Sequence, residues 1–279
     1  MKLRALVFVC ALALATFTPA LAAGASEAPL YYVSLGDSLA AGTQPDLAHP
    51  GTNIPFTNQS YTDQLFAIER AKLPTLQHVK LACPGETTGT MIADGLAFPG
   101  VGVVEGRNPH ELCQYVHGSQ LAEAVSFLHA HQGFVAFVTI DIGANDVLNL
   151  GPAGGAAAIA ANLPVILAAL RDAAPRVRVI GMNYYDPRLV TWFINPAGLQ
   201  SEVNAAVGFN NFLESIYGGA GDSVADVEAA FDTTITTPVG GIPLDVLRIC
   251  TWTWMCAVQN IHANATGYHV IALAFAAKL

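Results

Sequence analysis

The stretch from Leu30 to Gly42 constrains the fold more than any other part of the sequence. It starts as an apolar run rich in aromatic and β-branched residues and ends in Gly36-Asp37-Ser38-Leu39, followed by small residues. Such a run predicts a buried strand, and the glycine after it predicts a turn. We therefore interpret Leu30 to Leu35 as a strand that delivers Ser38 to the carboxyl end of a sheet.

Strand and helix patterns alternate over most of the remaining chain. An alternation of this kind predicts an α/β protein with a parallel sheet that is covered by helices on both faces. Pro164 lies inside one expected helix and predicts a kink or a new start there. The further strands are expected at 76–82, 135–142, 176–183 and 223–227, the helices at 61–73, 119–131, 156–174, 196–217 and 263–278, and the long loops at 42–60, 95–117 and 232–260.

The first 22 residues have the pattern of a secretory signal peptide. Lys2 and Arg4 precede an apolar run from Leu6 to Phe17, and Ala20-Leu21-Ala22 fits a small-x-small cleavage site. The run is short for a membrane span, so we expect no stable membrane insertion after cleavage. We expect a secreted, extracellular protein in which residues 23–279 form one domain.

The charge balance argues against nucleic acid as a partner. The chain has a formal net charge of −9 and no cluster of Lys or Arg. Removal of the leader takes away Lys2 and Arg4 and leaves ten basic residues. Against twenty-one acidic residues, the net charge of the mature chain is then −11. We expect a monomer. No His, Cys, Asp and Glu pattern has the spacing of a metal site, so we expect no metal and no cofactor.

Four cysteines remain once Cys10 is removed with the leader. An even number of cysteines in an exported protein predicts two disulfides, and four cysteines allow three pairings. Proximity in the chain favours Cys83–Cys113 and Cys250–Cys256. The alternatives are four unpaired buried thiols or a zinc site, although the spacing is not that of a ribbon or finger.

Ser38 and His262 are the candidate catalytic residues. A serine becomes a good nucleophile only when a base removes its proton, and a neutral imidazole can do so near pH 7. His262 stands just before the last expected helix. Donors must also hold the oxyanion that the attack creates. Gly89 and Asn145, each in a turn after an expected strand, are the candidate donors, together with the Ser38 backbone N–H.

These residues resemble the GDSL, or SGNH, family of serine esterases and lipases. The family takes its second name from Ser, Gly, Asn and His in four separated blocks. Here the blocks are Gly36-Asp37-Ser38-Leu39, Gly85 to Gly89, Gly143-Ala144-Asn145-Asp146 and Ile261 to Tyr268. They occur in the family's order over almost the whole chain after the leader. The resemblance implies a three-layer α/β/α sandwich with a flavodoxin-like, doubly wound sheet. It further implies a secreted, actinobacterial-type enzyme that hydrolyses carboxylic esters through an acyl-enzyme, with a small-molecule or lipid ester as its substrate.

The sequence departs from the family pattern at one position. The family usually has an aspartate three residues before the histidine, where this chain has Gln259 followed by Asn260. Neither side chain can be the charged third member of a triad. We therefore expect a Ser38–His262 dyad in which a backbone carbonyl between 250 and 260 orients the imidazole. A distant acid, Asp226 or Asp245 for example, is the alternative.

Three other functions compete with an ordinary esterase. A thioesterase or phospholipase would use the same site, and only substrates would distinguish them. A secreted carbohydrate-binding module on a degenerate hydrolase fold would explain the missing aspartate, but all four family residues are present. A metal-dependent hydrolase would need ligand spacing that the sequence lacks.

Overall fold

The computed structural model describes residues 28–93 and 112–279. Its centre is a five-stranded sheet in which every pair of neighbouring strands is parallel. The strands are β1 (Leu30–Gly36), β4 (Leu76–Lys80), β5 (Val135–Asp141), β6 (Arg178–Met182) and β7 (Ser223–Ala225). Their spatial order is β4-β1-β5-β6-β7, which is the flavodoxin-like order. The predicted parallel, doubly wound α/β sheet is confirmed.

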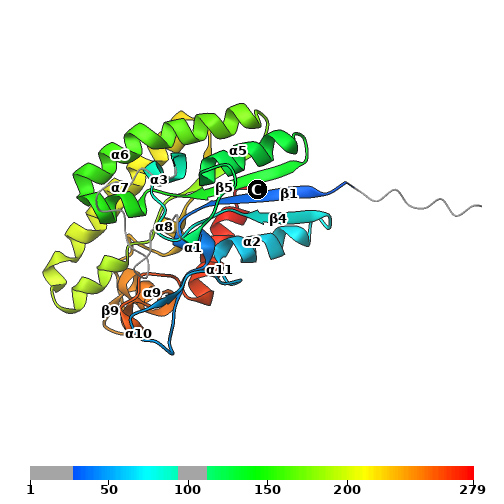
Figure 1. Cartoon of the computed structure of the whole chain (residues 1–279). Helices are drawn as coiled ribbons and strands as arrows, with labels where there is room; N and C mark the ends of the chain where they lie inside the picture. The colour runs from blue at the N-terminus through cyan, green and yellow to red at the C-terminus, as the bar shows by residue number, and fades with distance from the viewer. Residues whose placement is uncertain (1–27, 94–111) are drawn as a thin grey trace, which may run out of the picture.

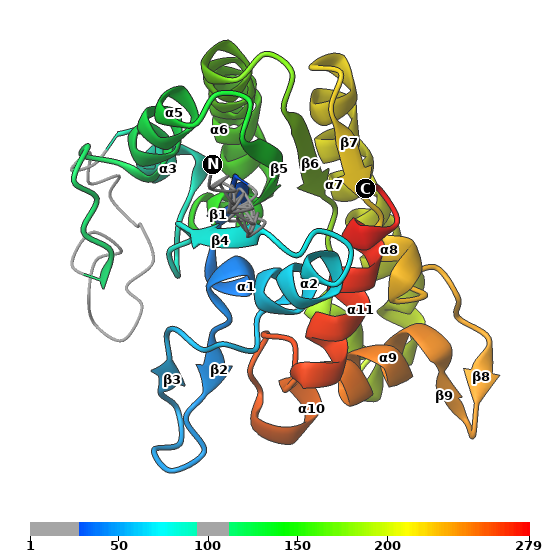
Figure 2. The ribbon, with the colours of Figure 1, turned by 90° about the vertical axis from the view of Figure 1, so that its right-hand side faces the viewer.

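Helices cover both faces of the sheet (Figure 1, Figure 2). One face carries α3 (Thr88–Ile92), α5 (Gln120–Ala130), α6 (Ala144–Ala173) and α7 (Leu199–Gly219). The other face carries α2 (Tyr61–Arg70) and α11 (Ala265–Ala276), which pack against each other. The result is the three-layer α/β/α sandwich that the family resemblance implies.

The central strands are buried because both of their faces contact helices. Tyr32, Val33 and Leu35 of β1 have no exposed surface. The Tyr32 hydroxyl also forms a 2.7 Å hydrogen bond with Thr139 Oγ1 on β5. An apolar run without alternation is what a strand buried on both faces requires, and this explains the composition of β1.

Polar side chains define where the main helices begin. Ser60 caps α2 and forms a capping box with Asp63, and Ser119 caps α5 by accepting from the Ala122 N–H. Asn264 caps α11 by accepting from the N–H groups of Thr266 and Gly267. These caps satisfy N–H groups that have no partner inside the helix.

Helix α6 differs from the expectation in its start and in its break. It begins at Ala144, directly after β5, and its backbone leaves the helical region at Gly151 (φ 71°, ψ 171°), not at Pro164. The residue before a proline is disfavoured in helical geometry, and Gly151 precedes Pro152. By length and composition α6 could cross a membrane, but here it packs against α3, α5 and α7.

The segment expected as a loop at 232–260 contains regular structure. It forms the short ribbon β8 (Pro238–Val239) and β9 (Ile242–Pro243), and the helices α9 (Leu244–Trp252) and α10 (Met255–Val258). Val246 and Ile249 of α9 face the core. The many Thr, Pro, Gly and Trp residues mask this apolar spacing in the sequence.

Short elements complete the described chain. They are α1 (Ser38–Ala41), the ribbon strands β2 (Gln44–Pro45) and β3 (Asn53–Ile54), the 3₁₀ turns η1 (Pro187–Phe193) and η2 (Pro196–Gly198), and α8 (Val227–Ala230).

Both predicted disulfides form. Cys83 bonds Cys113, and Cys250 bonds Cys256 across the α9–α10 junction. The first bond anchors the segment after β4. Most of the loop expected at 95–117, and the whole leader at 1–22, lie outside the described residues.

Candidate active site

The candidate site lies beyond the carboxyl ends of three neighbouring strands. Ser38 follows β1, Gly89 follows β4, and Asn145 follows β5. Strand order reverses between β1 and β5, and ligands of open α/β sheets bind at such switch points. Three of the four family blocks therefore meet because their strands are neighbours in the sheet.

Ser38 is the first residue of α1 and is half-buried. Asp37 caps this helix, because its Oδ1 accepts from the Leu39 N–H at 2.9 Å. The Ser38 N–H has no acceptor among the described residues and is free to bind a ligand. Position 36 requires glycine for two reasons. Its φ of 138° disfavours other residues, and a Cβ there would lie 1.9 Å from Asp141 Oδ1.

In the first turn of α3, Gly89 has the one backbone N–H that lacks an acceptor in the described structure. The Thr88 N–H donates to Asp146 Oδ2 at 2.9 Å, and the Thr90 N–H donates to Thr87 Oγ1 at 3.1 Å. The Met91 N–H donates to the Thr87 carbonyl. Asp146 thus anchors the start of α3 and leaves the Gly89 N–H available.

Asn145 ties the turns of Ser38 and Gly89 together. Its Nδ2 donates to the Glu86 carbonyl at 2.9 Å, in the turn before α3. The same nitrogen lies 3.3 Å from Asp37 Oδ2, next to Ser38. The first contact is a normal hydrogen bond and the second is long, so one N–H can turn to a ligand at little cost.

His262 is brought to the site by contacts with the segment after α1. Gln44 Nε2 donates to the Ala263 carbonyl at 2.8 Å, and the Tyr268 hydroxyl donates to the Thr43 carbonyl at 2.9 Å. The Thr43 N–H in turn donates to the Ser38 carbonyl. The fourth family block is therefore fastened to the chain that leaves Ser38. No hydrogen bond joins Ser38 Oγ to His262 Nε2 within the described part of the chain.

The side chain of Asn260, not a backbone carbonyl, contacts the imidazole. Asn260 Oδ1 lies 2.8 Å from His262 Nδ1. The alternative acids are engaged elsewhere, since Asp226 caps α8 and Asp245 accepts from the Val246 N–H. Gln259 is exposed and adopts a left-handed backbone (φ 55°). The prediction that a backbone carbonyl orients the imidazole is wrong. The tight turn at Gln259 places the side chain of Asn260 against the imidazole instead.

Burial keeps the imidazole neutral. His262 is only 8% exposed, and burial lowers its pKa to about 4. No charged group opposes this shift, because the Nδ1 partner is an uncharged amide. Neutral imidazole is the form that can accept a proton from a serine.

Acidic side chains are buried beneath the Ser38 turn. Burial, followed by the nearby Asp37 charge, raises the pKa of Asp141 well above its ordinary value, and burial raises the pKa of Asp37 to about 6. The Tyr61 hydroxyl donates to Asp141 Oδ1 at 2.8 Å. Both raised pKa values favour the protonated forms and so oppose two full negative charges beside Gly36.

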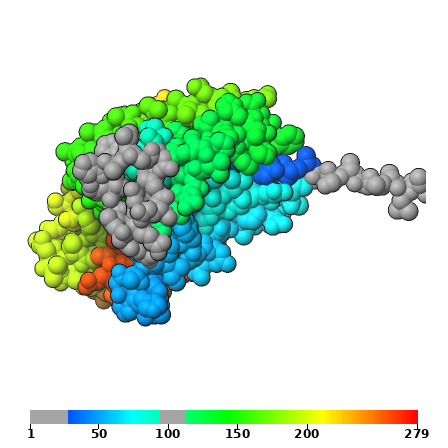
Figure 3. Space-filling view, in the orientation of Figure 1, coloured from blue at the N-terminus to red at the C-terminus, as the bar shows by residue number. Residues whose placement is uncertain are grey.

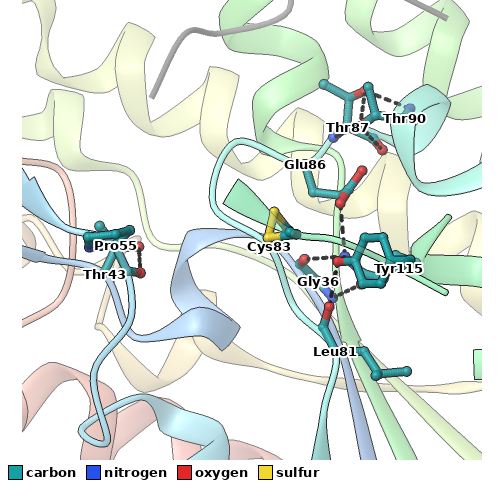
Figure 4. Close-up of a disulfide and its surroundings, with 11 residues drawn as sticks. Gly36, Thr43, Pro55, Leu81, Cys83, Glu86, Thr87, Thr90 and Tyr115 are labelled. Carbon is teal, nitrogen blue, oxygen red and sulfur yellow. Dashed lines mark hydrogen bonds between the residues drawn. A yellow bond between two sulfur atoms is a disulfide. The ribbon is translucent and has the colours of Figure 1, made fainter. Parts of the chain in front are cut away.

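Glu86 belongs to the same buried region. Gln120 Nε2 donates to Glu86 Oε2 at 3.0 Å and to the Gly36 carbonyl at 3.0 Å. Figure 4 shows Glu86 pointing toward Gly36 and Tyr115, close to the Cys83 disulfide. Burial raises the pKa of Glu86 to about 7. No cluster of three or more His, Cys, Asp or Glu side chains in residues 28–93 and 112–279 is arranged to hold a metal ion.

Solved structures with the same fold include enzymes that hydrolyse esters. The chain is 16% identical to phospholipase A1 from Streptomyces albidoflavus NA297, with a TM-score of 0.53 over 90% of this chain and 100% of that chain. It is 13% identical to Axe2, an acetylxylan esterase from Geobacillus stearothermophilus, with a TM-score of 0.54 over 89% and 93%. Identities this low show the shared fold alone. No curated protein matches the chain in sequence.

The sequence profile of the GDSL-like lipase/acylhydrolase family matches residues 34–270. This range contains all four family blocks and every strand of the central sheet except the first residues of β1. The chain belongs to this family and is a carboxylic ester hydrolase by class.

Proposed function

We propose that the chain is a secreted serine hydrolase that cleaves carboxylic esters through an acyl-enzyme on Ser38, with His262 as the general base. The observation that carries this proposal is a set of three hydrogen-bond donors at the neighbouring turns of Ser38 and Gly89. The N–H groups of Ser38 and Gly89 lack acceptors in the described structure, and Asn145 Nδ2 lies between their turns. Two of these donors have no partner in the described structure and the third has one weak contact to give up, so the set fits an oxyanion.

The first half of the reaction acylates the enzyme. Ser38 Oγ attacks the ester carbonyl carbon while its proton passes to His262 Nε2. The negative charge that develops on the carbonyl oxygen is held by the N–H groups of Ser38, Gly89 and Asn145. The C–O bond to the alcohol then breaks, and the departing alcohol takes the proton from His262. Ser38 is left as an ester of the substrate's acyl group.

The second half regenerates the enzyme. A water molecule attacks the acyl carbonyl and gives a proton to His262 Nε2, and the same donors hold the new oxyanion. The bond to Ser38 Oγ breaks, Ser38 recovers the proton from His262, and the carboxylic acid leaves. Ser38 Oγ and His262 Nε2 must approach for this, and such contacts are commonly longer in a free enzyme than with substrate bound.

The surface next to the site favours an ester with an apolar acyl or alcohol group. Asn53 of the β2–β3 ribbon contacts Asn260, so the ribbon adjoins the histidine segment, and Figure 3 shows the ribbon at the surface beside the segment of α9 and α10. The ribbon and its flanks, and the segment before His262, both carry exposed apolar side chains: Leu47, Ile54, Phe56, Val258 and Ile261. Burying these side chains against a substrate would be favourable.

A thioesterase or phospholipase with the same residues is the alternative within this chemistry. Initial rates on p-nitrophenyl esters of two to sixteen carbons, on an acyl thioester and on a phospholipid would separate the three. A rate that rises with chain length is expected from the exposed apolar side chains of the ribbon and of the segment before His262. A preference for acetate would assign the specificity to another part of the surface.

The central experiment is labelling of the mature protein with a fluorophosphonate, followed by intact mass analysis and peptide mapping. We expect one adduct on Ser38, and none in the Ser38→Ala and His262→Ala variants. His269→Ala is the control, because this histidine lies on α11 and contacts Gln64. No adduct on folded wild-type protein would overturn the proposal and favour the carbohydrate-binding alternative.

A further inference from the structure

We propose that Asn260 is the third member of the catalytic set, a positioning residue that orients His262 through its side-chain oxygen, and that Asn53 on β3 fixes the orientation of the Asn260 amide. The inference rests on the proposed function, because it assigns a role relative to the His262 base. It names two residues outside the four family blocks. It also explains how the chain works without the usual aspartate at the position of Gln259.

The contacts identify which end of the Asn260 amide faces the histidine. One Asn260 atom lies 3.0 Å from the His262 backbone nitrogen and 2.8 Å from its Nδ1. A backbone N–H can only donate, so this atom must be the oxygen Oδ1. An oxygen cannot donate to Nδ1, so Nδ1 carries the imidazole proton. Nε2 is then the unprotonated nitrogen, which is the tautomer that a general base needs.

Asn53 prevents the Asn260 amide from turning over. Asn260 Nδ2 donates to Asn53 Oδ1 at 2.7 Å, so the amide nitrogen is engaged on the side away from the histidine. A turned amide would lose this bond and would point an N–H at the backbone N–H of His262. The ribbon is itself held in place, because Gln44 of β2 accepts from Trp254 Nε1 and donates to the Ala263 carbonyl.

An amide in this position gives the histidine a different charge environment from an aspartate. The hydroxyls of Tyr185 and Tyr268 donate to the carbonyls of Ile261 and Thr43, close to the His262 segment, and both stay neutral. Asp37 caps α1 beside Ser38, and burial raises its pKa to about 6. None of these groups pairs with the imidazole in the described chain, so the amide is its one polar partner.

The first test replaces the amide by a carboxylate of the same shape. In Asn260→Asp the carboxylate would face Nδ1–H and favour the imidazolium, so we expect the acidic limb of the kcat/KM profile to move up by about 1 pH unit or more. Gln259→Asp is the matched control, because it restores the family's aspartate at an exposed, left-handed residue. We expect its profile to stay that of the wild type.

The second test removes the side-chain oxygen of Asn260 that faces the imidazole. For Asn260→Ala we expect kcat to fall about 10- to 100-fold with KM nearly unchanged, which is the effect of one lost hydrogen bond to a group that becomes charged. For Asn53→Ala we expect a smaller loss in kcat. The ¹⁵N spectrum of the imidazole should show Nδ1 protonated in the wild type at pH 7 and a mixture of tautomers in Asn260→Ala.

The outcomes separate this inference from the proposed function. If fluorophosphonate labels Ser38 but Asn260→Asp leaves the pH profile unmoved, the role of Asn260 is wrong and the proposed function stands. If Ser38 is not labelled in the folded wild type, the proposed function fails first. If Asn260→Ala does not fold, Asn260→Asp and the wild-type ¹⁵N spectrum still decide the question, since an Nε2-protonated imidazole would overturn the assignment.

Discussion

At the scale of single residues, Asn145 joins two tasks that most side chains perform separately. One of its N–H groups holds the turn before α3 through the Glu86 carbonyl, and the other is weakly engaged by Asp37. We predict that Asn145→Ala lowers kcat about 10²- to 10³-fold, because an oxyanion donor is lost. Asn204→Ala is the control and should keep wild-type kcat, because this residue is exposed on α7 and its side chain contacts Gln200. Steady-state kinetics on a folded variant with unchanged kcat would remove Asn145 from the site.

The buried imidazole sets a second prediction at this scale. Burial lowers the pKa of His262 to about 4, so the base stays unprotonated down to weakly acidic pH. We therefore expect protonation of His262 to lower kcat/KM only as pH drops through about 4. Between pH 7 and 5 the group beside Ser38 that titrates is Asp37, with a pKa of about 6. A rate profile at constant ionic strength measures this. An acidic limb near pH 6.5, the ordinary value for histidine, that persists in Asp37→Asn would show that the imidazole is hydrated or paired with a charge in the working enzyme.

At the scale of elements, the break in α6 separates the segment that bears Asn145 from the rest of the helix. Gly151 makes the break with a φ of 71°, which an L-residue adopts only under strain. We predict that Gly151→Ala lowers the free energy of unfolding by about 1 kcal/mol. Space does not limit the substitution, since a Cβ at Gly151 would have no neighbour within 4 Å.

Gly208 provides the matched control for this prediction. It lies inside α7, is exposed, and has an equally open Cβ position without a positive φ. Gly208→Ala should raise the free energy of unfolding by about 0.5–1 kcal/mol, because alanine loses less conformational entropy in a helix. Urea titrations of both variants compare the two signs directly. Equal effects of the two substitutions would show that the left-handed geometry at Gly151 carries no cost.

At the scale of the whole molecule, the buried acids make stability depend on pH. The pKa of Glu86 is raised to about 7 by burial, and one of its oxygens, Oε1, has no hydrogen-bond partner in the described structure. A raised folded-state pKa contributes stability that is complete below the unfolded value and is lost as pH rises through the folded value. Stability from this group is therefore lost between about pH 4.5 and 7.

We predict that Glu86→Gln removes this loss. The variant should be more stable than the wild type above pH 7, by an amount on the order of 3 kcal/mol, and close to it at pH 4. Gln has the shape of protonated Glu and keeps the contact with Gln120. Thermal unfolding from pH 4 to 8 gives the comparison, with Glu202→Gln, on α7, as the surface control. A destabilised variant at pH 8 would mean that the carboxylate has a cationic or solvent partner.

The sequence predicts the sheet, its helices and the four site blocks because each is a local signal. Apolar runs mark β1 and β5, and Ser119 caps its helix as its position indicates. The roles of Asn260 and Asn53 have no such signal. They are far apart in the chain and meet only because the β2–β3 ribbon folds against the segment before α11. The helices at 244–258 were missed because Trp, Thr and Pro dilute their apolar spacing. Asp141 could have been noticed, since an acid inside the apolar run of β5 must find a buried partner.

The order of the functional blocks along the chain has a consequence for biosynthesis. Every strand of the central sheet, and the turns of Ser38, Gly89 and Asn145, precede His262 in the sequence. A chain is synthesised from its N-terminus, so these parts emerge first and the base emerges last. On the proposed mechanism, a partly emerged chain holds a nucleophile that nothing activates. Hydrolysis then begins only when synthesis is nearly complete and the segment before α11 docks on Gln44.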